Sequence, residues 1–144
     1  MLDARPPVTV LHVEDDRELG DAVRTLLGLS GYDVVTATHG DEAVQHVLVN
    51  GLRPDVLIVD YMLGEEETGS DVAEHIARIV GFPIATILLS ADIVNAEVPW
   101  MPGAPILLVS KPFDPAALID TIEHFAALQR AARQRSLHSG TAHS

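Results

Sequence analysis

The sequence predicts a doubly wound α/β fold, in which helices cover both faces of a five-stranded parallel sheet. Three observations lead to this prediction: the chain has five short apolar segments, most of them are continuous rather than alternating, and helical patterns lie between them. Continuous apolar runs are typical of strands buried on both faces, as the strands of parallel sheets are. With 144 residues, of which 47% are hydrophobic, the chain is expected to form one domain around one core.

The apolar segments are the expected strands of the sheet. In chain order they are Val8–Val13, Asp33–Ala37, Val56–Val59, Ile84–Leu89 and Ile106–Val109. The second has the weakest apolar pattern, which is expected of a strand at an edge of the sheet. Because strands and helices alternate, we expect parallel strands joined by right-handed crossovers.

Four helices are expected from apolar residues at helical spacing. A short side chain that can accept a hydrogen bond from a backbone N–H group marks the start of each helix. These N-cap residues are Asp16, Asp41, Ser70 and Asp114. The first three helices are expected to end at Gly31, Asn50–Gly51 and Gly81, and Pro115 suits the first turn of the last helix.

Two segments depart from this alternation. The segment "ADIVNAEVPWMPGAP" contains three prolines and a glycine, which leave room for one short helical turn at most, around Ile93–Val98. The last residues of the chain have no apolar periodicity. We therefore expect a domain over residues 1–134 and a disordered C-terminal tail over residues 135–144.

The composition argues against several classes of protein. A net charge of −12 disfavours binding to the phosphates of nucleic acids, and the lack of cysteine excludes disulfides and thiolate metal sites. The N-terminus does not resemble a signal peptide, and no apolar run approaches the ~20 residues that cross a bilayer. We expect a cytoplasmic protein that contacts neither nucleic acid nor membrane.

Polar residues stand where four of the apolar segments end. Glu14 and Asp15 follow the first segment, Asp60 the third, Ser90 the fourth and Lys111 the fifth. The carboxyl ends of parallel strands share one edge of the sheet, and ligands bind there. We therefore expect these side chains to converge on one site.

The expected set of side chains suits phosphoryl chemistry. Crowded carboxylates repel one another unless a cation joins them, and oxygen ligands alone favour Mg²⁺. A carboxylate can also attack phosphorus to form an acyl phosphate. Mg²⁺ and Lys111 could then neutralise the phosphoryl oxygens, and Ser90 could hydrogen-bond to one of them. Asp60 is better explained as such a nucleophile than as a turn residue.

The segments "VEDD", "LIVDYM", "LLSAD" and "SKPF", in this order and at these spacings, resemble the receiver domain of two-component response regulators. The resemblance covers the chain from about Val8 to about Leu128. It implies a flavodoxin-like fold with the strand order 2-1-3-4-5. It also implies a single-domain response regulator, which is a phosphoacceptor switch rather than an enzyme of metabolism.

The resemblance implies a role for each site residue. Asp60 would accept a phosphoryl group from a phosphohistidine of a sensor kinase or of a histidine phosphotransfer protein. Ser90 would be the switch hydroxyl, Lys111 would contact the phosphoryl group, and the Lys111–Pro112 bond would be cis. The implied Mg²⁺ ligands are Glu14, Asp15, Asp60 and the backbone carbonyl of Met62.

Three features depart from the usual receiver pattern. Leu108 stands where receivers usually carry an aromatic residue, the fourth helix is degenerate, and the loop "LGEEETG" after Asp60 is one residue longer than usual and lacks a proline. Phosphoryl transfer needs none of these features, whereas signal readout does. We expect phosphorylation to work and its output, through contacts with an unknown downstream protein, to be unusual. Trp100 in the irregular segment is expected to report the change.

Two other functions stay open. The chain could be a pseudo-receiver adaptor that takes no phosphate, although its acid, hydroxyl and lysine set argues against this. It could also be a phosphatase of the haloacid dehalogenase type, but that class needs an acid where Met62 stands and a nucleophile on the first strand. The seven histidines are spread over different segments and are not expected to bind metal, and the acidic loop Glu65–Glu67 is expected to be solvated charge that influences partner preference.

Overall fold

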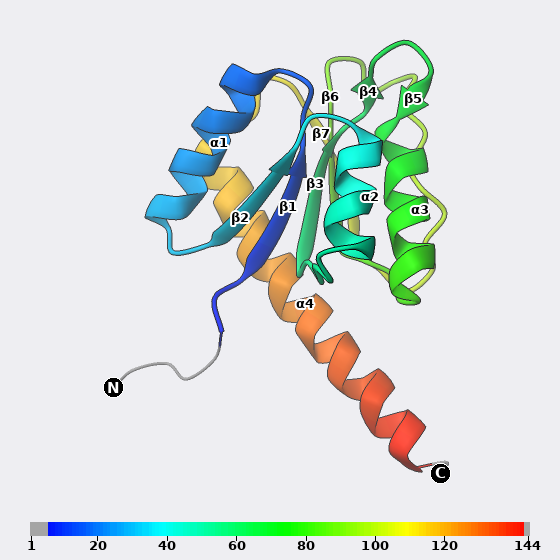
Figure 1. Cartoon of the computed structure of the whole chain (residues 1–144). Coiled ribbons are helices and arrows are strands. Elements are labelled where there is room, and N and C mark those ends of the chain that lie inside the picture. The colour runs from blue at the N-terminus through cyan, green and yellow to red at the C-terminus, as the bar shows by residue number, and fades with distance from the viewer. Residues whose placement is uncertain (1–5, 143–144) are drawn as a thin grey trace.

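The computed structural model describes residues 6–142, with side chains described for residues 6–137. Five parallel strands form the central sheet, in the order β2-β1-β3-β6-β7. Their bounds are β1 (Thr9–Val13), β2 (Asp33–Ala37), β3 (Val56–Asp60), β6 (Thr86–Ser90) and β7 (Ile106–Ser110). In terms of these five strands the order is 2-1-3-4-5, so the expected doubly wound, flavodoxin-like fold is confirmed (Figure 1).

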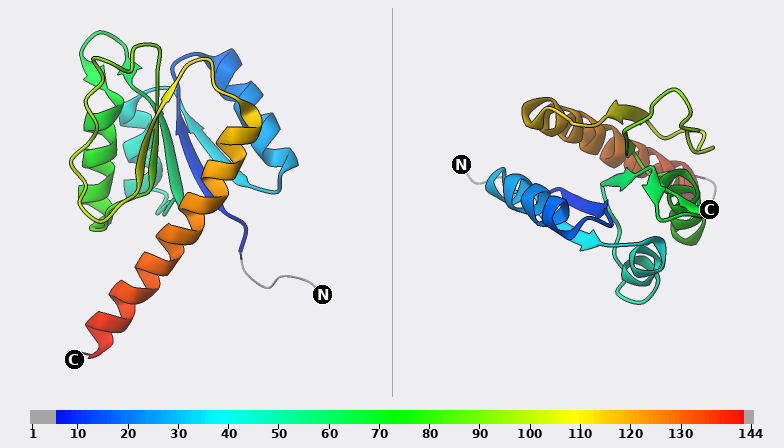
Figure 2. Two further views of the ribbon diagram at one scale, coloured as in Figure 1. Left: turned by 180° about the vertical axis from the view of Figure 1, so that it is seen from behind. Right: turned by 90° about the horizontal axis from the view of Figure 1, so that it is seen from above.

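Helices cover the sheet on both faces (Figure 2). The helices α1 (Arg17–Leu29) and α4 (Pro115–Ala142) lie on one face, and α2 (Gly40–Leu48) and α3 (Gly69–Val80) lie on the other. Successive residues of a strand point to opposite faces. Ile58 therefore joins the core under α1 and α4, whereas Leu57 and Val59 join the core under α2 and α3. This double burial is the reason for the continuous apolar runs.

The ends of the helices follow the sequence signals in part. Asp16 caps α1 by accepting hydrogen bonds from the N–H groups of Glu18 and Leu19, and Gly81 ends α3 in the left-handed conformation. The expected caps Asp41 and Ser70 are wrong. An earlier side chain takes the capping position in both helices: His39 Nδ1 accepts from Glu42 N, and Thr68 Oγ1 accepts from Asp71 N. The residues Asp41 and Ser70 then lie inside the first turns of α2 and α3.

The degenerate fourth helix is confirmed. Residues 91–105, between β6 and β7, contain no helix, not even the single turn that the sequence allowed. The hydroxyl of Ser70 donates to the carbonyl of Glu97, and Pro99 and Met101 are buried. The segment is thus held to the domain by a few contacts rather than by a helical face.

The last helix is longer than the sequence suggested. We expected disorder from residue 135, but α4 continues to Ala142 and extends past the sheet (Figure 1). The prediction used apolar periodicity, which reports packing, whereas a helix that has already formed gains one backbone hydrogen bond with each residue that it adds. Helix propensity does not explain the extension, because residues 135–142 are mostly Ser, His, Gly and Thr. Residues 143–144 of the expected tail lie outside the described residues.

None of the helices in the described part of the chain combines the length and the apolar character that crossing a bilayer requires.

Candidate functional site

The carboxyl ends of four strands bring the predicted site residues to one edge of the sheet. Glu14 and Asp15 follow β1, Asp60 is the last residue of β3, Ser90 is the last of β6, and Lys111 follows β7. Strand pairing aligns the ends of β3, β6 and β7, because Asp60 lies opposite Leu89 and Ser90 opposite Ser110. The sequence prediction that these side chains converge is confirmed.

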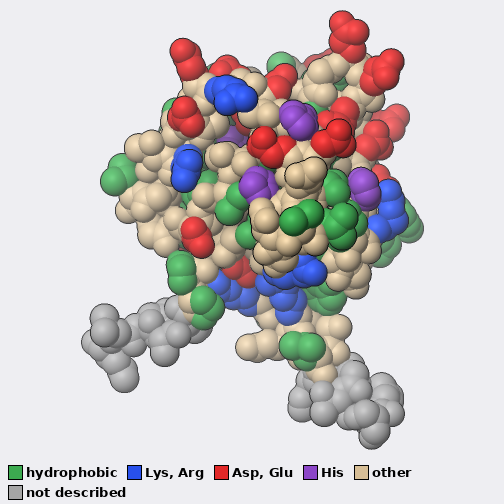
Figure 3. Space-filling model, in the orientation of Figure 1, with side chains coloured by type: hydrophobic (Ala, Val, Ile, Leu, Met, Phe, Trp, Pro, Cys, Tyr) green, Lys and Arg blue, Asp and Glu red, His purple; other side chains and the backbone are tan. Residues whose placement is uncertain are grey.

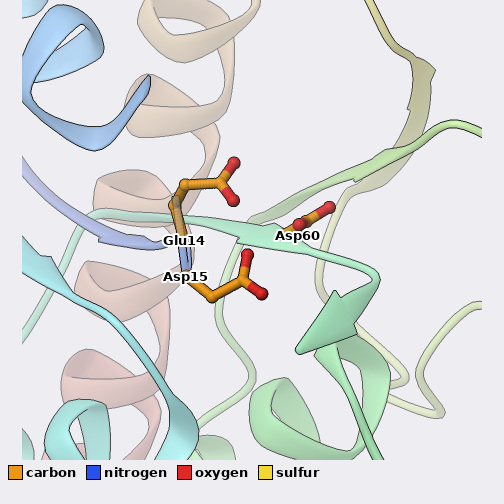
Figure 4. A group of neighbouring side chains, drawn as sticks. All are labelled: Glu14, Asp15 and Asp60. Carbon is orange, nitrogen blue, oxygen red and sulfur yellow. The ribbon is translucent and has the colours of Figure 1, made fainter. Parts of the chain in front are cut away.

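Three carboxylates form the acidic cluster of the site. One oxygen each from Glu14, Asp15 and Asp60 lies within 4.8 Å of the others, and the side chains face a common space (Figure 4). Glu14 and Asp60 are 3% and 8% exposed, whereas Asp15 is exposed. Burial and the nearby charge of Asp60 raise the pKa of Glu14 to about 7, although hydrogen bonding by Asp16 N and the charge of Lys111 oppose this. The cluster therefore carries unfavourable negative charge.

Lys111 neutralises part of that charge. Its Nζ lies 3.0 Å from Asp60 Oδ1 and 3.2 Å from Glu14 Oε1. Partial burial lowers the pKa of Lys111, but its hydrogen bond with Asp60 and the charges of both carboxylates outweigh this and raise it. The Lys111–Pro112 peptide bond is cis, as the sequence predicted.

Ser90 lies beside the acidic cluster but bonds elsewhere. Its Oγ donates to the carbonyl of Asp92 and accepts from the N–H of Asp92, at 2.9 and 3.1 Å. Ser90, Asp60, Met62 and Lys111 line the same cavity, which has a volume of about 430 Å³. The hydroxyl thus borders the space above Asp60 while it holds the first residues of the segment 91–105.

A short hairpin carries Met62, and the sequence analysis missed it. The strands β4 (Met62–Leu63) and β5 (Glu67–Thr68) pair antiparallel in the loop after Asp60. Two-residue strands are too short to show periodicity, and the one local signal is Gly64, which adopts a positive φ of 88° at the turn. The Met62 side chain is 52% exposed, as is expected if its backbone rather than its sulfur has the functional role.

The expectation for the acidic loop is only partly correct. Glu65 and Glu66 are exposed at the turn of the hairpin. Glu67 is half-buried, and its Oε1 accepts a hydrogen bond of 2.9 Å from Gly40 N, at the start of α2. Sequence reasoning could not find this contact, because its partners stand 27 positions apart.

His12 is a second feature that the sequence did not reveal. The side chain is fully buried on β1, and neither ring nitrogen has a hydrogen-bond partner among the described residues. Burial and the nearby charge of Lys111 lower the pKa of His12 to about 4, so the ring is neutral near pH 7. Its position in an apolar run was the only hint of its burial.

The acidic cluster fits a hard divalent cation. Its side-chain donors are all carboxylate oxygens, two of them on buried residues, and the raised pKa of Glu14 indicates that one Lys111 leaves the site short of positive charge. Mg²⁺ and Ca²⁺ prefer such oxygen ligands. Zn²⁺, which favours His and Cys, would find neither type of ligand in this cluster.

Comparison with known proteins agrees with this geometry. Residues 10–123 match the family model described as the response regulator receiver domain. A probable transcriptional regulator of Guillardia theta is 32% identical over 81% of this chain and 44% of its own length. The response regulator MprA of Mycobacterium sp. (strain KMS) is 31% identical over 86% of this chain and 51% of its own. The chain thus spans about half the length of these curated relatives.

Solved structures give the same result. The N-terminal domain of a three-domain response regulator/sensory box/GGDEF protein from Carboxydothermus hydrogenoformans is 28% identical, with a TM-score of 0.73 over 85% of this chain and 97% of that one. A receiver domain protein from Methanospirillum hungatei, at 19% identity, shares the fold with a TM-score of 0.72 over 88% of this chain and 98% of that one. Taken with the acidic cluster and its lysine, these matches show that the chain belongs to the response regulator receiver domain family.

Proposed function

We propose that this protein is a phosphoacceptor switch in which Asp60 receives a phosphoryl group from a phosphohistidine. The observation that carries the proposal is the position of the Asp60 carboxylate, which lies 3.0 Å from Lys111, within the acidic cluster, and borders a cavity of about 430 Å³. The donor is a sensor histidine kinase or a histidine phosphotransfer protein. Transfer breaks the bond between phosphorus and the imidazole nitrogen and forms a bond from phosphorus to a carboxylate oxygen of Asp60.

The surrounding residues have distinct tasks in this transfer. Glu14, Asp15, Asp60 and the backbone carbonyl of Met62 would hold Mg²⁺, which when bound supplies positive charge for the phosphoryl oxygens. Lys111 is already paired with Asp60, so it can contact a phosphoryl oxygen on that residue with little movement. Ser90 can hydrogen-bond another phosphoryl oxygen only after it gives up its bonds to Asp92.

The hydrogen bonds between Ser90 and Asp92 also provide a way to signal phosphorylation to another protein. Recruitment of Ser90 to the phosphoryl group removes two hydrogen bonds from the start of the segment 91–105. Leu108 is half-buried against the α2–α3 core and has no ring that could move with the hydroxyl, so the segment itself carries the change. With a net charge of −12, the partner that reads this change is a protein rather than a nucleic acid.

Intact-mass measurement after incubation with acetyl phosphate and Mg²⁺ tests the proposal. The wild type is expected to gain one phosphoryl group, and Asp60→Asn, which keeps the shape of the side chain, is expected to gain none. Omitting Mg²⁺ should slow the wild-type reaction strongly. If the wild type binds Mg²⁺ but neither forms an adduct nor binds beryllofluoride, the chain is a pseudo-receiver and the proposal is wrong.

A further inference from the structure

The hairpin that carries Met62 is tied to a distant helix by one side chain. Glu67 Oε1 accepts a hydrogen bond of 2.9 Å from the N–H of Gly40, the first residue of α2. The first N–H groups of a helix have no partner within it, and a carboxylate there is favoured by the helix dipole. The contact therefore satisfies a free donor of α2 and holds β5 against the start of that helix.

The contact, as it stands, leaves no room for a side chain on the helix residue. A Cβ at Gly40 would lie 2.4 Å from Glu67 Oε2, which is closer than two unbonded atoms can approach. Gly40 is not among the glycines with positive φ, so its backbone conformation does not demand glycine. Glycine at this position lets the carboxylate of Glu67 lie where it does, whereas an added Cβ would make that side chain move.

The other side of the hairpin is held just as closely. Gly69 N donates to Tyr61 O at 2.7 Å, and a Cβ at Gly69 would lie 2.4 Å from the carbonyl oxygen of Asp60. Leu63, which pairs with Glu67, is buried in the core under α2 and α3. The hairpin is therefore held by the bond between Tyr61 and Gly69 and by the burial of Leu63 on β4. Glu67 holds the other strand, β5, through its bond to Gly40 N.

The pairing directs the Met62 carbonyl out of the hairpin. In an antiparallel ladder, pairs that exchange backbone hydrogen bonds alternate with pairs that do not. Gly69 N donates to Tyr61 O, while Tyr61 N donates to Leu89 O in the main sheet, so Tyr61 and Gly69 share one bond of the ladder. Met62 and Thr68, the next pair in register, then take a non-bonded position. By this alternation the carbonyl of Met62, two residues after Asp60, is expected to point away from β5.

We propose that Glu67 is a positioning residue for the metal site. By tying β5 to the N-terminus of α2, it fixes the hairpin and therefore the place of the Met62 carbonyl beside the acidic cluster. This inference rests on the proposed function, because it takes that carbonyl as a ligand of Mg²⁺. Residues that orient a metal ligand typically change metal affinity by about 10- to 100-fold when they are removed.

Calorimetric titration of the full chain with Mg²⁺ tests whether the hydrogen bond between Glu67 and Gly40 N supports metal binding. Glu67→Ala is expected to weaken Mg²⁺ binding about tenfold. This is the low end of the range for residues that orient a metal ligand without binding the metal themselves. Glu67→Gln keeps an acceptor oxygen for Gly40 N and should therefore bind Mg²⁺ much more tightly than Glu67→Ala does. Glu66→Gln removes the same charge from an exposed neighbour and should bind Mg²⁺ nearly as tightly as the wild type.

A double-mutant cycle of Glu67→Ala and Gly40→Ala separates the loss of this hydrogen bond from a general loss of stability. Gly40→Ala, with Glu67 present, is expected to displace the carboxylate and weaken Mg²⁺ binding as Glu67→Ala does. Adding Gly40→Ala to Glu67→Ala should cost nothing more, because the shorter side chain leaves room for the added Cβ. Hydrogen exchange should show faster exchange in residues 62–68 of both single variants while the strands of the sheet stay protected.

The outcomes distinguish this inference from the function on which it rests. If the wild type binds no Mg²⁺, the proposed function fails. If the wild type binds Mg²⁺ and Glu67→Ala binds it equally well, the positioning role is wrong and the function stands. Equal losses in Glu67→Ala and Glu66→Gln would assign the effect to charge and overturn the inference. Should Glu67→Ala not fold, the comparison of folded Gly40→Ala with the wild type decides the question in the same way.

Discussion

His12 is a fully buried, neutral imidazole on β1. Its burial makes the free energy of unfolding depend on pH. Its pKa is about 4 in the folded chain and about 6.5 when unfolded. Between these values the unfolded chain binds a proton that the folded chain does not, so the free energy of unfolding falls as the pH falls. A shift of this size corresponds to about 3 kcal/mol, lost progressively from about pH 6.5 to pH 4.

Replacing His12 with leucine should remove this dependence. Denaturant unfolding of the wild type and of His12→Leu, at several values between pH 4 and 7, gives the difference in their free energies of unfolding. We expect the wild type to lose about 3 kcal/mol relative to the variant across this range. Glu14 acts in the opposite sense, because its raised pKa costs stability as the pH rises from about 4.5 to 7, but it is present in both proteins. If the free energies of unfolding of the two proteins changed equally with pH, His12 would not be the source of the dependence.

If the acidic cluster holds Mg²⁺ as proposed, Glu14 makes the metal affinity depend on pH near neutrality. Its pKa of about 7 means that the carboxyl holds a proton below this pH, and a divalent cation must displace that proton to bind. Mg²⁺ affinity is expected to fall about tenfold for each pH unit below 7, with the release of about one proton. Calorimetry at pH 5.5, 6.5 and 8 measures both quantities. Glu14→Gln should bind Mg²⁺ more weakly and with a nearly flat pH profile, and an equally steep profile in that variant would assign the proton to another group.

At the scale of elements, Asp55 joins three segments that are far apart in the chain. This buried carboxylate precedes β3 and accepts hydrogen bonds from Thr9 N on β1 and from Arg130 and Arg133 on α4, at 2.9 to 3.2 Å. Arg130 also donates to the carbonyls of Pro6 and Pro7. These contacts set the direction in which α4 leaves the domain.

Asp55→Ala should therefore destabilise the fold and loosen α4. Removing the acceptor leaves Thr9 N and two guanidinium groups without their shared partner, which we expect to cost about 2 to 4 kcal/mol in the free energy of unfolding. Urea denaturation measures this cost, with Glu65→Ala as a control that removes an exposed acid. An equal effect of the two substitutions would show that the bonds of Asp55 contribute little.

Sequence reasoning succeeded where a feature is local and failed where it depends on a distant contact. The strands, the missing fourth helix and the convergence of Asp60 with Lys111 follow from short motifs and from the geometry of parallel sheets. The tie from Glu67 to Gly40 leaves no periodic signal, because two residues of strand cannot show one. The length of α4 was missed because apolar periodicity reports packing and cannot show how far an unpacked helix continues.

At the scale of the molecule, the face seen in Figure 3 carries its charge unevenly. Acidic side chains gather over the site edge of the sheet, and basic ones gather at the opposite end near α4 (Figure 3). Arg130 and Arg133 are engaged by Asp55 at that end. The site edge thus faces solvent with a negative potential. Under the proposed function, this potential would favour Mg²⁺ and a donor protein with a basic surface around its phosphohistidine.

Trp100 lies in the segment that begins at the bonds of Ser90. The segment 91–105 is held at its start by the bonds of Ser90 to Asp92 and farther along by the bond of Ser70 to Glu97. Trp100, the single tryptophan of the chain, is 80% exposed in this segment. If phosphorylation draws Ser90 toward Asp60, the first attachment is lost and the surroundings of Trp100 change.

Tryptophan emission should therefore report phosphorylation. Saturating beryllofluoride with Mg²⁺ is expected to shift or quench the emission of the wild type. Ser90→Ala lacks the hydroxyl but should still bind beryllofluoride at Asp60. Its emission should nevertheless change little, because the variant lacks the hydrogen bonds to Asp92 whose loss would move the segment. An unchanged wild-type spectrum at proven saturation would mean that the segment does not follow Ser90. A full change in Ser90→Ala would mean that the signal leaves the site by another route, with Lys111 the next contact of Asp60 to examine.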